Sequence, residues 1–132
     1  MTVFESKTVI AKPVADVYSF LSDINNHEQL MPENVSNWSS THDEARFSIQ
    51  NMGKLALKVS NRIEPSTIII IPADQVPFGV ELRWVLADNA DSTTTAVLTI
   101  SADLNMMMKM LASGPLQKLT DHQTQKLKKV LD

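Results

Sequence analysis

The side chains in this sequence that can bind or transform a small molecule include an unusual cluster of methionines. Four of the seven methionines, Met106, Met107, Met108 and Met110, fall within five residues. Unbranched thioether side chains adapt to irregular apolar shapes, so such a cluster is typical of a pocket that accepts variable ligands. The same side chains also fill gaps in an ordinary core, or form an exposed patch that docks a partner or a membrane surface.

Proton transfer would require a carboxylate or an imidazole held in a cavity with a shifted pKa. Asp103 precedes the last predicted helix and either points inward or, like Asn105, caps that helix. His27 is the one histidine expected near a cavity mouth, whereas His42 and His122 are expected to be solvated. The three histidines lack the grouping of a zinc site, and the chain has no cysteine. We therefore expect no metal and no cofactor.

Two tryptophans and two hydroxyl groups complete the candidate binding groups. Trp38 and Trp84 can each face a cavity with a large ring and a directed N–H donor, or pack in the core or at its rim. Ser6 and Thr8 share the inner face of the first predicted strand, where their hydroxyls contact either a ligand or neighbouring backbone.

Charge and hydropathy exclude several classes of function. The formal net charge is −3, with acidic and basic residues interspersed, so no nucleic-acid partner is expected. The basic tail of the last helix (Lys118, Lys126, Lys128 and Lys129) suits the negative end of a helix dipole. No apolar run is long enough to span a bilayer, and no secretory signal is visible at the N-terminus. We expect a cytoplasmic protein.

Hydrophobic periodicity predicts the elements that must position these groups. Alternation with period two predicts seven strands, at residues 2–11, 35–41, 46–50, 54–64, 67–71, 78–87 and 93–102. Glycine at Asn51-Met52-Gly53 marks a turn. Helical spacing predicts one short helix after Pro13 and a second at residues 24–31, after Ser22-Asp23. It returns at residues 106–112 and 115–131, two segments that Gly114-Pro115 separates.

The inward faces follow from the same alternation. Phe4, Ser6 and Thr8 face inward on the first strand, and Leu98 and Ile100 do so on the last. On the strands between them, the alternation places residues on a shared face without fixing its direction: Phe47 with Ile49, then Leu55, Leu57, Val59, Asn61 and Ile63, and then Phe78, Val80, Leu82, Trp84 and Leu86.

One strand, two short helices, six strands and a long helix make an α+β plan for a single domain over residues 1–132. The connections are short, as in antiparallel hairpins. The curved sheet needs an apolar element to close it, and only the C-terminal helix is long enough.

Several segments carry a resemblance to a known family: Ile10-Ala11-Lys12-Pro13, residues 16–23, Leu30-Met31-Pro32, Ala102-Asp103-Leu104-Asn105 and Gly114-Pro115-Leu116. Over essentially its whole length the chain resembles the START-like superfamily (SRPBCC, polyketide-cyclase or birch-pollen-allergen helix-grip proteins), in a small bacterial branch. The resemblance implies a helix-grip fold, in which a curved antiparallel sheet wraps around a long C-terminal helix. It leaves the substrate open, because lipid carriers, receptors, cyclases and chaperone activators share this fold.

The predicted function is binding or carriage of a small apolar or amphipathic ligand between the sheet and the C-terminal helix. The candidate cavity residues are Phe4, Ser6, Thr8, His27, Trp38, Phe47, Leu57, Trp84, Leu98, Asp103, Met107, Met108 and Leu111. Met107, Met108 and Leu111 are expected at the cavity mouth, and residues 116–130 are expected mainly to hold the fold together. The alternatives are a protein-interaction module with a packed interior, and a cyclase or dehydratase that uses Asp103 or His27 for proton transfer.

Overall fold

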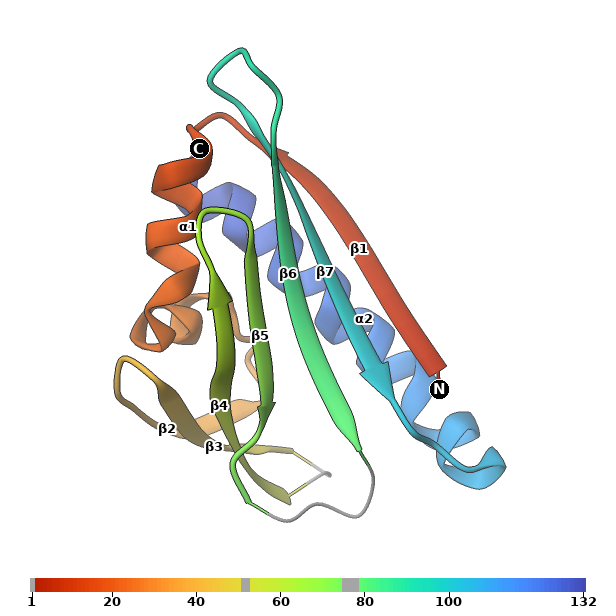
Figure 1. The fold of residues 1–132 in the computed structure, drawn as a ribbon. Coiled ribbons are helices and arrows are strands. Elements are labelled where there is room, and N and C mark those ends of the chain that lie inside the picture. The colour runs from red at the N-terminus through yellow and green to blue at the C-terminus, as the bar shows by residue number, and fades with distance from the viewer. Residues whose placement is uncertain (1, 51–52, 75–78) are drawn as a thin grey trace.

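The chain forms one curved antiparallel sheet closed by a long helix. The structure, a computed structural model, describes residues 2–50, 53–74 and 79–132. Its elements are β1 (Thr2–Ile10), α1 (Val14–Ser22), the 3₁₀ helix η1 (Ile24–Leu30), β2 (Val35–Ser40), β3 (Glu44–Ile49), β4 (Gly53–Ile63), β5 (Thr67–Pro72), β6 (Val80–Asp88), β7 (Thr94–Ala102) and α2 (Met106–Leu131). The strands follow the order β1-β7-β6-β5-β4-β3-β2 (Figure 1). This confirms the predicted α+β plan. Of the positions named above, Asn51, Met52 and Phe78 lie outside the described residues.

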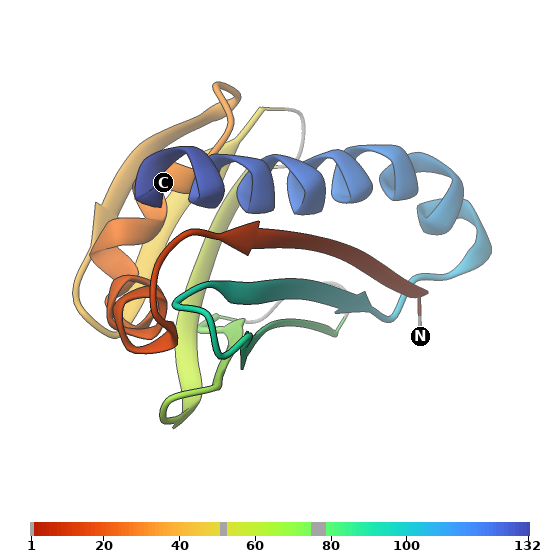
Figure 2. The ribbon, with the colours of Figure 1, turned by 90° about the horizontal axis from the view of Figure 1, so that it is seen from above.

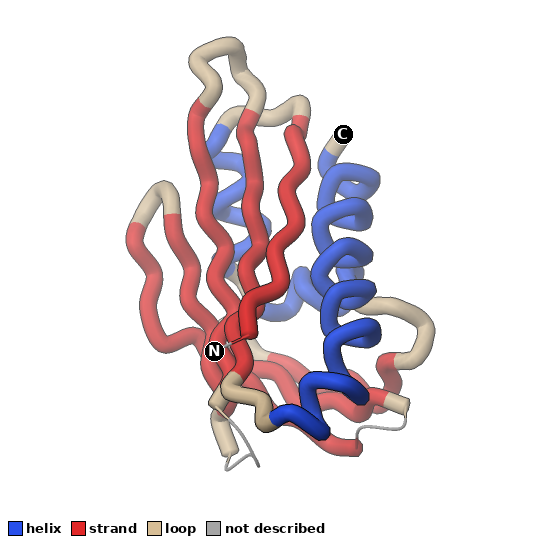
Figure 3. Tube along the Cα trace, turned by 90° about the vertical axis from the view of Figure 1, so that its right-hand side faces the viewer, coloured by secondary structure: helices blue, strands red, loops and turns tan. Residues whose placement is uncertain are grey.

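Helix α2 lies along the inner side of the sheet. It packs most extensively against β1, and it also contacts β7 and η1. Figure 2 shows the sheet curving around α2, and Figure 3 shows the helix as a separate layer beside the strands. None of the helices in the described parts of the chain has the length and apolar character needed to span a bilayer.

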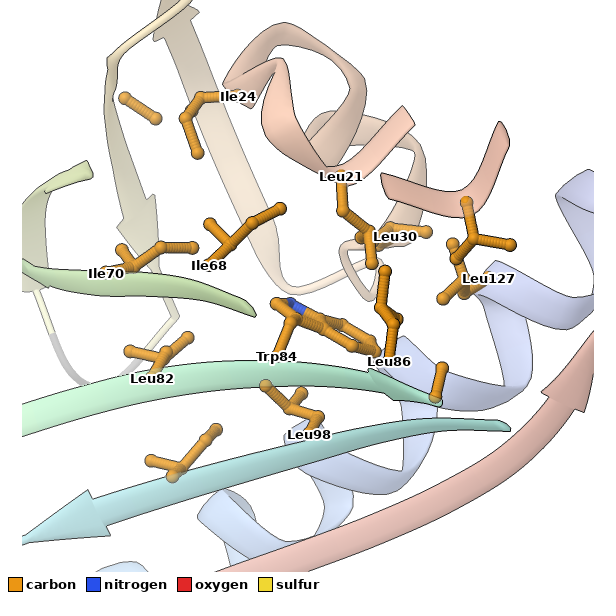
Figure 4. Close-up of a cluster of buried hydrophobic side chains, with 14 of the residues drawn as sticks. Leu21, Ile24, Leu30, Ile68, Ile70, Leu82, Trp84, Leu86, Leu98 and Leu127 are labelled. Carbon is orange, nitrogen blue, oxygen red and sulfur yellow. The ribbon is translucent and has the colours of Figure 1, made fainter. Parts of the chain in front are cut away.

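The core lies between the sheet, α2 and the two short helices. Ser6, Leu98, Trp84 and Ile68 are register partners in one row across β1, β7, β6 and β5. The last three are fully buried, and Figure 4 shows Trp84 at the centre of the cluster, with Leu127 of α2 on one side. Removing each such side chain from water stabilises the fold by about 1.5–3 kcal/mol. The predicted inward positions of Leu98 and Ile100 are confirmed.

A bulge in β4 corrects the predicted face of two residues, Asn61 and Ile63. Val59 pairs with Ile70, but Asn61 pairs with Ile69, so the register shifts between them. An extra residue inverts the alternation beyond it. Asn61 and Ile63, predicted to share a face with Val59, are therefore exposed, Ile63 to 49%, and Arg62 turns inward instead. Its guanidinium donates to the carbonyls of Ser22 and His42.

Helix α2 is continuous, whereas Gly114-Pro115 was expected to divide it into two segments. Pro115 lies within the helix, and its missing N–H leaves the carbonyl of Leu111 without the usual helical donor. Leu111 is 72% exposed, so water can solvate that carbonyl. Gly114 also lacks the Cβ that would crowd the proline ring. These two features explain why the helix tolerates the proline.

The two edge strands of the sheet, β1 and β2, differ in how their exposed edges are protected. On β1, α2 donates side-chain hydrogen bonds to two backbone carbonyls: Gln117 Nε2 to Glu5 over 3.3 Å and Lys128 Nζ to Val9 over 2.9 Å. On the opposite edge, β2 has only six residues and an irregular register. Within that irregularity Asn37 has a φ of 56°.

Candidate functional site

A groove lies between α2 and the neighbouring ends of β2 and β3. Its volume is about 550 Å³. We call it the α2 groove, and it is lined by Pro32, Glu33, Asn34, Val35, Ile49, Gly114, Pro115, Leu116, Lys118, Leu119 and His122. This volume falls within the range of about 300–1,000 Å³ that is usual for small-molecule sites.

The apolar part of the α2 groove comes from two elements that are distant in sequence. Val35, the first residue of β2, pairs directly with Ile49, the last residue of β3. Leu116 and Leu119 face them from α2, on the stripe that continues into the core. Pro32 lies on the β2 side of the groove, because it follows η1 and directs the chain into β2.

The polar part of the α2 groove includes one lysine, one histidine and one glutamate. Lys118 and His122 are four residues apart on α2, so they lie on one face of the helix, and Glu33 is the carboxylate in the lining. Lys118 is exposed and His122 is half-buried. The side chains of Glu33, Lys118 and His122 form no hydrogen bond or ion pair with any of the described residues. Their polar groups are available to a bound molecule.

Two polar atoms are buried without a partner among the described residues: Gln123 Oε1 and Trp84 Nε1. Gln123 is 1% exposed and lies one helical turn beyond Leu119. An unpaired buried acceptor costs about 1–3 kcal/mol. The interior beside the α2 groove therefore retains unmet hydrogen-bonding capacity.

The hydroxyls of Ser6, Thr120 and Thr124, on or beside α2, are paired. Ser6 Oγ on β1 lies 2.6 Å from Thr124 Oγ1, and Thr124 also donates to the carbonyl of Asp121. Thr120 donates to the carbonyl of Leu116. Thr8 is half-buried on the same strand face as Ser6.

The structure places the two residues considered for proton transfer in different environments. His27 is buried, and its Nε2 lies 2.7 Å from the carbonyl oxygen of Leu21, so this nitrogen carries the proton in the neutral ring. Burial lowers the pKa of His27 below its ordinary value of 6.5, against the opposing effects of this hydrogen bond and of the Asp23 carboxylate. Asp103 is exposed, and the cap of α2 is instead Asn105, which accepts from the Met108 N–H.

The predicted aromatic and aliphatic candidates belong mainly to the core. Trp38 is half-buried and stacks on Phe47, with ring centroids 5.2 Å apart, while its Nε1 donates to Ser40 Oγ. Trp84 and Leu98 are adjacent in register and fully buried. Phe4 is buried in the same core, and Leu57 of β4 packs against this core.

The methionine cluster forms the exposed beginning of α2. Met106, Met107, Met110 and Leu111 are 72–81% exposed, and Met108 is half-buried. Figures 1 and 2 show this part of α2 projecting past the end of β1. Among the described residues, the lining of the α2 groove begins one turn later, at Gly114.

A second hollow, of about 470 Å³, involves β3 and β4. Its lining includes Arg46, Lys54 and Asp74. Arg46 and Asp74 already form an ion pair with an N–O distance of 2.8 Å, so two of its charges are satisfied. This makes it a weaker candidate than the α2 groove.

Sequence reasoning did not single out the residues that line the α2 groove. Leu116 and Leu119 lie in the segment 115–131 that was predicted to be helical, whereas Lys118 was interpreted as part of a basic tail and His122 as solvated. Periodicity within the helix carries no information about its neighbour, however, and only the folded chain brings these residues to Val35 and Ile49. In the described portions of the chain no group of three or more His, Cys, Asp or Glu residues is placed to hold a metal.

Comparison with known proteins rests on structure. No family model and no curated protein matches the sequence. Among solved structures, XoxI from Bacillus cereus matches with a TM-score of 0.79 at 8% identity, over 99% of this chain and 96% of that one. A START superfamily protein from Mycobacterium smegmatis matches with a TM-score of 0.70 at 16% identity, over 98% and 95% of the two chains. The chain has the START-like helix-grip fold.

A third match extends the comparison to a biosynthetic protein. The di-domain ARO/CYC BexL from the BE-7585A biosynthetic pathway matches with a TM-score of 0.66 at 10% identity, over 96% of this chain and 46% of that one. At these identities the likeness concerns the helix-grip fold alone, and function has to be argued from the site.

Proposed function

We propose that this helix-grip protein binds a small apolar or amphipathic ligand in the α2 groove. The observation that carries the proposal is an apolar hollow of about 550 Å³ between the sheet and the C-terminal helix. Solved neighbours with the same fold include a START superfamily protein and an ARO/CYC protein, which supports a ligand-binding role in general terms.

The arrangement of polar groups favours binding over proton transfer. The Nε2 of His27 is paired with a backbone carbonyl, and Asp103 is exposed to solvent. A general acid or base must reach the substrate within hydrogen-bond distance. Neither residue is in the lining of the α2 groove, so the proposal assigns no catalytic step to them.

Calorimetric titration with decanol tests the proposal, because decanol is uncharged and probes the apolar surface alone. We expect saturable binding to the purified protein, with a negative heat-capacity change from burial of apolar surface. Leu119→Trp enlarges a groove-lining side chain and should weaken this binding. Leu111→Trp makes the same change at an exposed position of α2 and should leave binding unchanged. Absence of saturable binding, or equal losses in both variants, would overturn the proposal.

A further inference from the structure

We propose that the ligand of the α2 groove is anionic at one end: an apolar chain or ring that carries a carboxylate or phosphate head. The head would lie at Lys118 and His122, and the apolar part along Leu116 and Ile49. This inference rests on the proposed function and adds the chemical class of the ligand to it.

The first support is the position of the two basic side chains. Lys118 and His122 both line the α2 groove from one face of α2. Among the described residues neither is engaged in an ion pair or a side-chain hydrogen bond. By contrast, Lys128, near the end of α2, forms an ion pair with Asp132. The ammonium of Lys118 therefore needs no existing contact to be broken before it binds an anion.

The second support is the amphipathic layout of the α2 groove. Leu116 and Ile49 are 7% and 8% exposed, so they form an apolar floor, whereas Lys118 is exposed at the rim. A ligand that satisfies both parts needs an apolar body and a charged end. A cation would meet Lys118 at the rim, and like charges at close range are unfavourable.

The third support is the position of the one carboxylate in the described lining of the α2 groove. Glu33 is the carboxylate among the lining residues of the α2 groove, and it is exposed and forms no ion pair with Lys118 among the described residues. It lies on the strand side, across from the helix. Removing the charge of Glu33 should strengthen the binding of an anionic head, whereas removing the charge of Lys118 should weaken it.

The experiment compares four probes of equal chain length by calorimetric titration: decanol, decanoate, decyl phosphate and decyltrimethylammonium. A carboxylate loses more hydration than a hydroxyl when it enters an apolar site, so without a cation decanol binds at least as tightly as decanoate. We expect decanoate or decyl phosphate to bind about two- to fivefold more tightly than decanol, as for a solvent-screened ion pair. The stronger of the two anions identifies the head group.

Variants of exposed residues then locate the charge. Lys118→Met should remove the preference for the anion, and Lys118→Arg should retain it. Lys129→Met makes the same charge change further along α2 and should leave the preference intact. Glu33→Gln should strengthen decanoate binding and leave decanol binding unchanged.

The outcomes separate this inference from the proposed function. Saturable decanol binding without a preference for either anion, or with tighter binding of decyltrimethylammonium, overturns the inference and leaves the apolar site standing. Equal effects of Lys118→Met and Lys129→Met also overturn it, because the effect would then come from overall charge. If none of the four probes binds, both proposals fail.

Discussion

Ser6 on the first strand and Thr124 on the last helix share a hydrogen bond between their hydroxyls, with 2.6 Å between the oxygens. The two residues are 118 positions apart. Thr124 has a second partner, the carbonyl of Asp121, whereas the Ser6 hydroxyl has Thr124 alone among the described residues. The contact joins α2 to the start of the register row that continues through Leu98 and Trp84.

The asymmetry of this pair predicts unequal effects of the two deletions. Thr124→Val keeps the shape of the side chain but leaves the half-buried Ser6 hydroxyl unpaired, so it should lower the free energy of unfolding by about 1–2 kcal/mol. Ser6→Ala leaves Thr124 bonded to Asp121 and should cost less. The double variant should cost less than the sum of the two single changes. Urea denaturation measures all three, and additive losses would contradict a direct interaction.

The core and the exposed beginning of α2 predict opposite responses to the same substitution. Leu127 is fully buried, so Leu127→Ala should lower the free energy of unfolding by about 2–5 kcal/mol through lost burial and a cavity. Leu111 is 72% exposed, and Leu111→Ala should change stability by about 0.5 kcal/mol or less. Urea denaturation of the two variants checks the contrast. A large loss at Leu111 would show that this face is covered in solution.

Arg62 joins three segments through one guanidinium. It donates to the carbonyls of Ser22 and His42, and its Nη1 lies 2.8 Å from Asp43 Oδ1. Its side chain is only 27% exposed, so Arg62→Met should lower the free energy of unfolding by about 1–3 kcal/mol.

Arg62→Lys should recover little of this loss, because an ammonium lacks the forked donors of a guanidinium. The control is Arg83→Met, which removes an exposed pair with Glu81 and should change stability by less than about 1 kcal/mol. Thermal unfolding followed by circular dichroism compares the variants. Equal losses at Arg62 and Arg83 would refute the bridging role.

Burial of His27 predicts a loss of stability in mild acid. Because burial lowers the pKa of His27 in the folded protein below 6.5, the unfolded chain binds a proton more readily than the folded one below that pH. The stability that neutral His27 contributes is therefore fully present above the pKa of this histidine in the unfolded chain. It is lost as pH falls through the pKa of His27 in the folded protein, by at most about 1.4 kcal/mol per pH unit. His27→Gln should flatten the change between about pH 7.5 and pH 5.5. An unchanged pH profile in urea denaturation would show that other groups cause it.

The sheet was predictable from sequence because its alternation follows directly from the pleat. Leu98 and Ile100 were placed inward by their period alone, and they are buried. Ile63 was placed on the wrong face because nothing in the alternation of β4 signals the bulge before it. Gly114-Pro115 was expected to end a helix, but an exposed helical turn can hydrate the carbonyl that proline leaves unpaired.

The candidate site was less accessible to sequence reasoning. Trp84, His27 and Met107 were selected for their chemical type, but type does not determine depth in the fold. Trp84 and His27 are buried, and Met107 is exposed. The α2 groove depends instead on the approach of α2 to the Val35–Ile49 pair. These segments are distant in the sequence, and no local pattern encodes their proximity.

The side-chain hydrogen bonds from α2 to β1 have a consequence for aggregation. A free strand edge presents carbonyls and N–H groups on which another chain can add a strand. Gln117 and Lys128 occupy the carbonyls of Glu5 and Val9, so detachment of α2 would expose an adhesive edge together with the apolar face of the sheet. At the other edge the irregular β2 gives poor support to such growth. Helix α2 therefore covers part of the β1 edge in addition to closing the core.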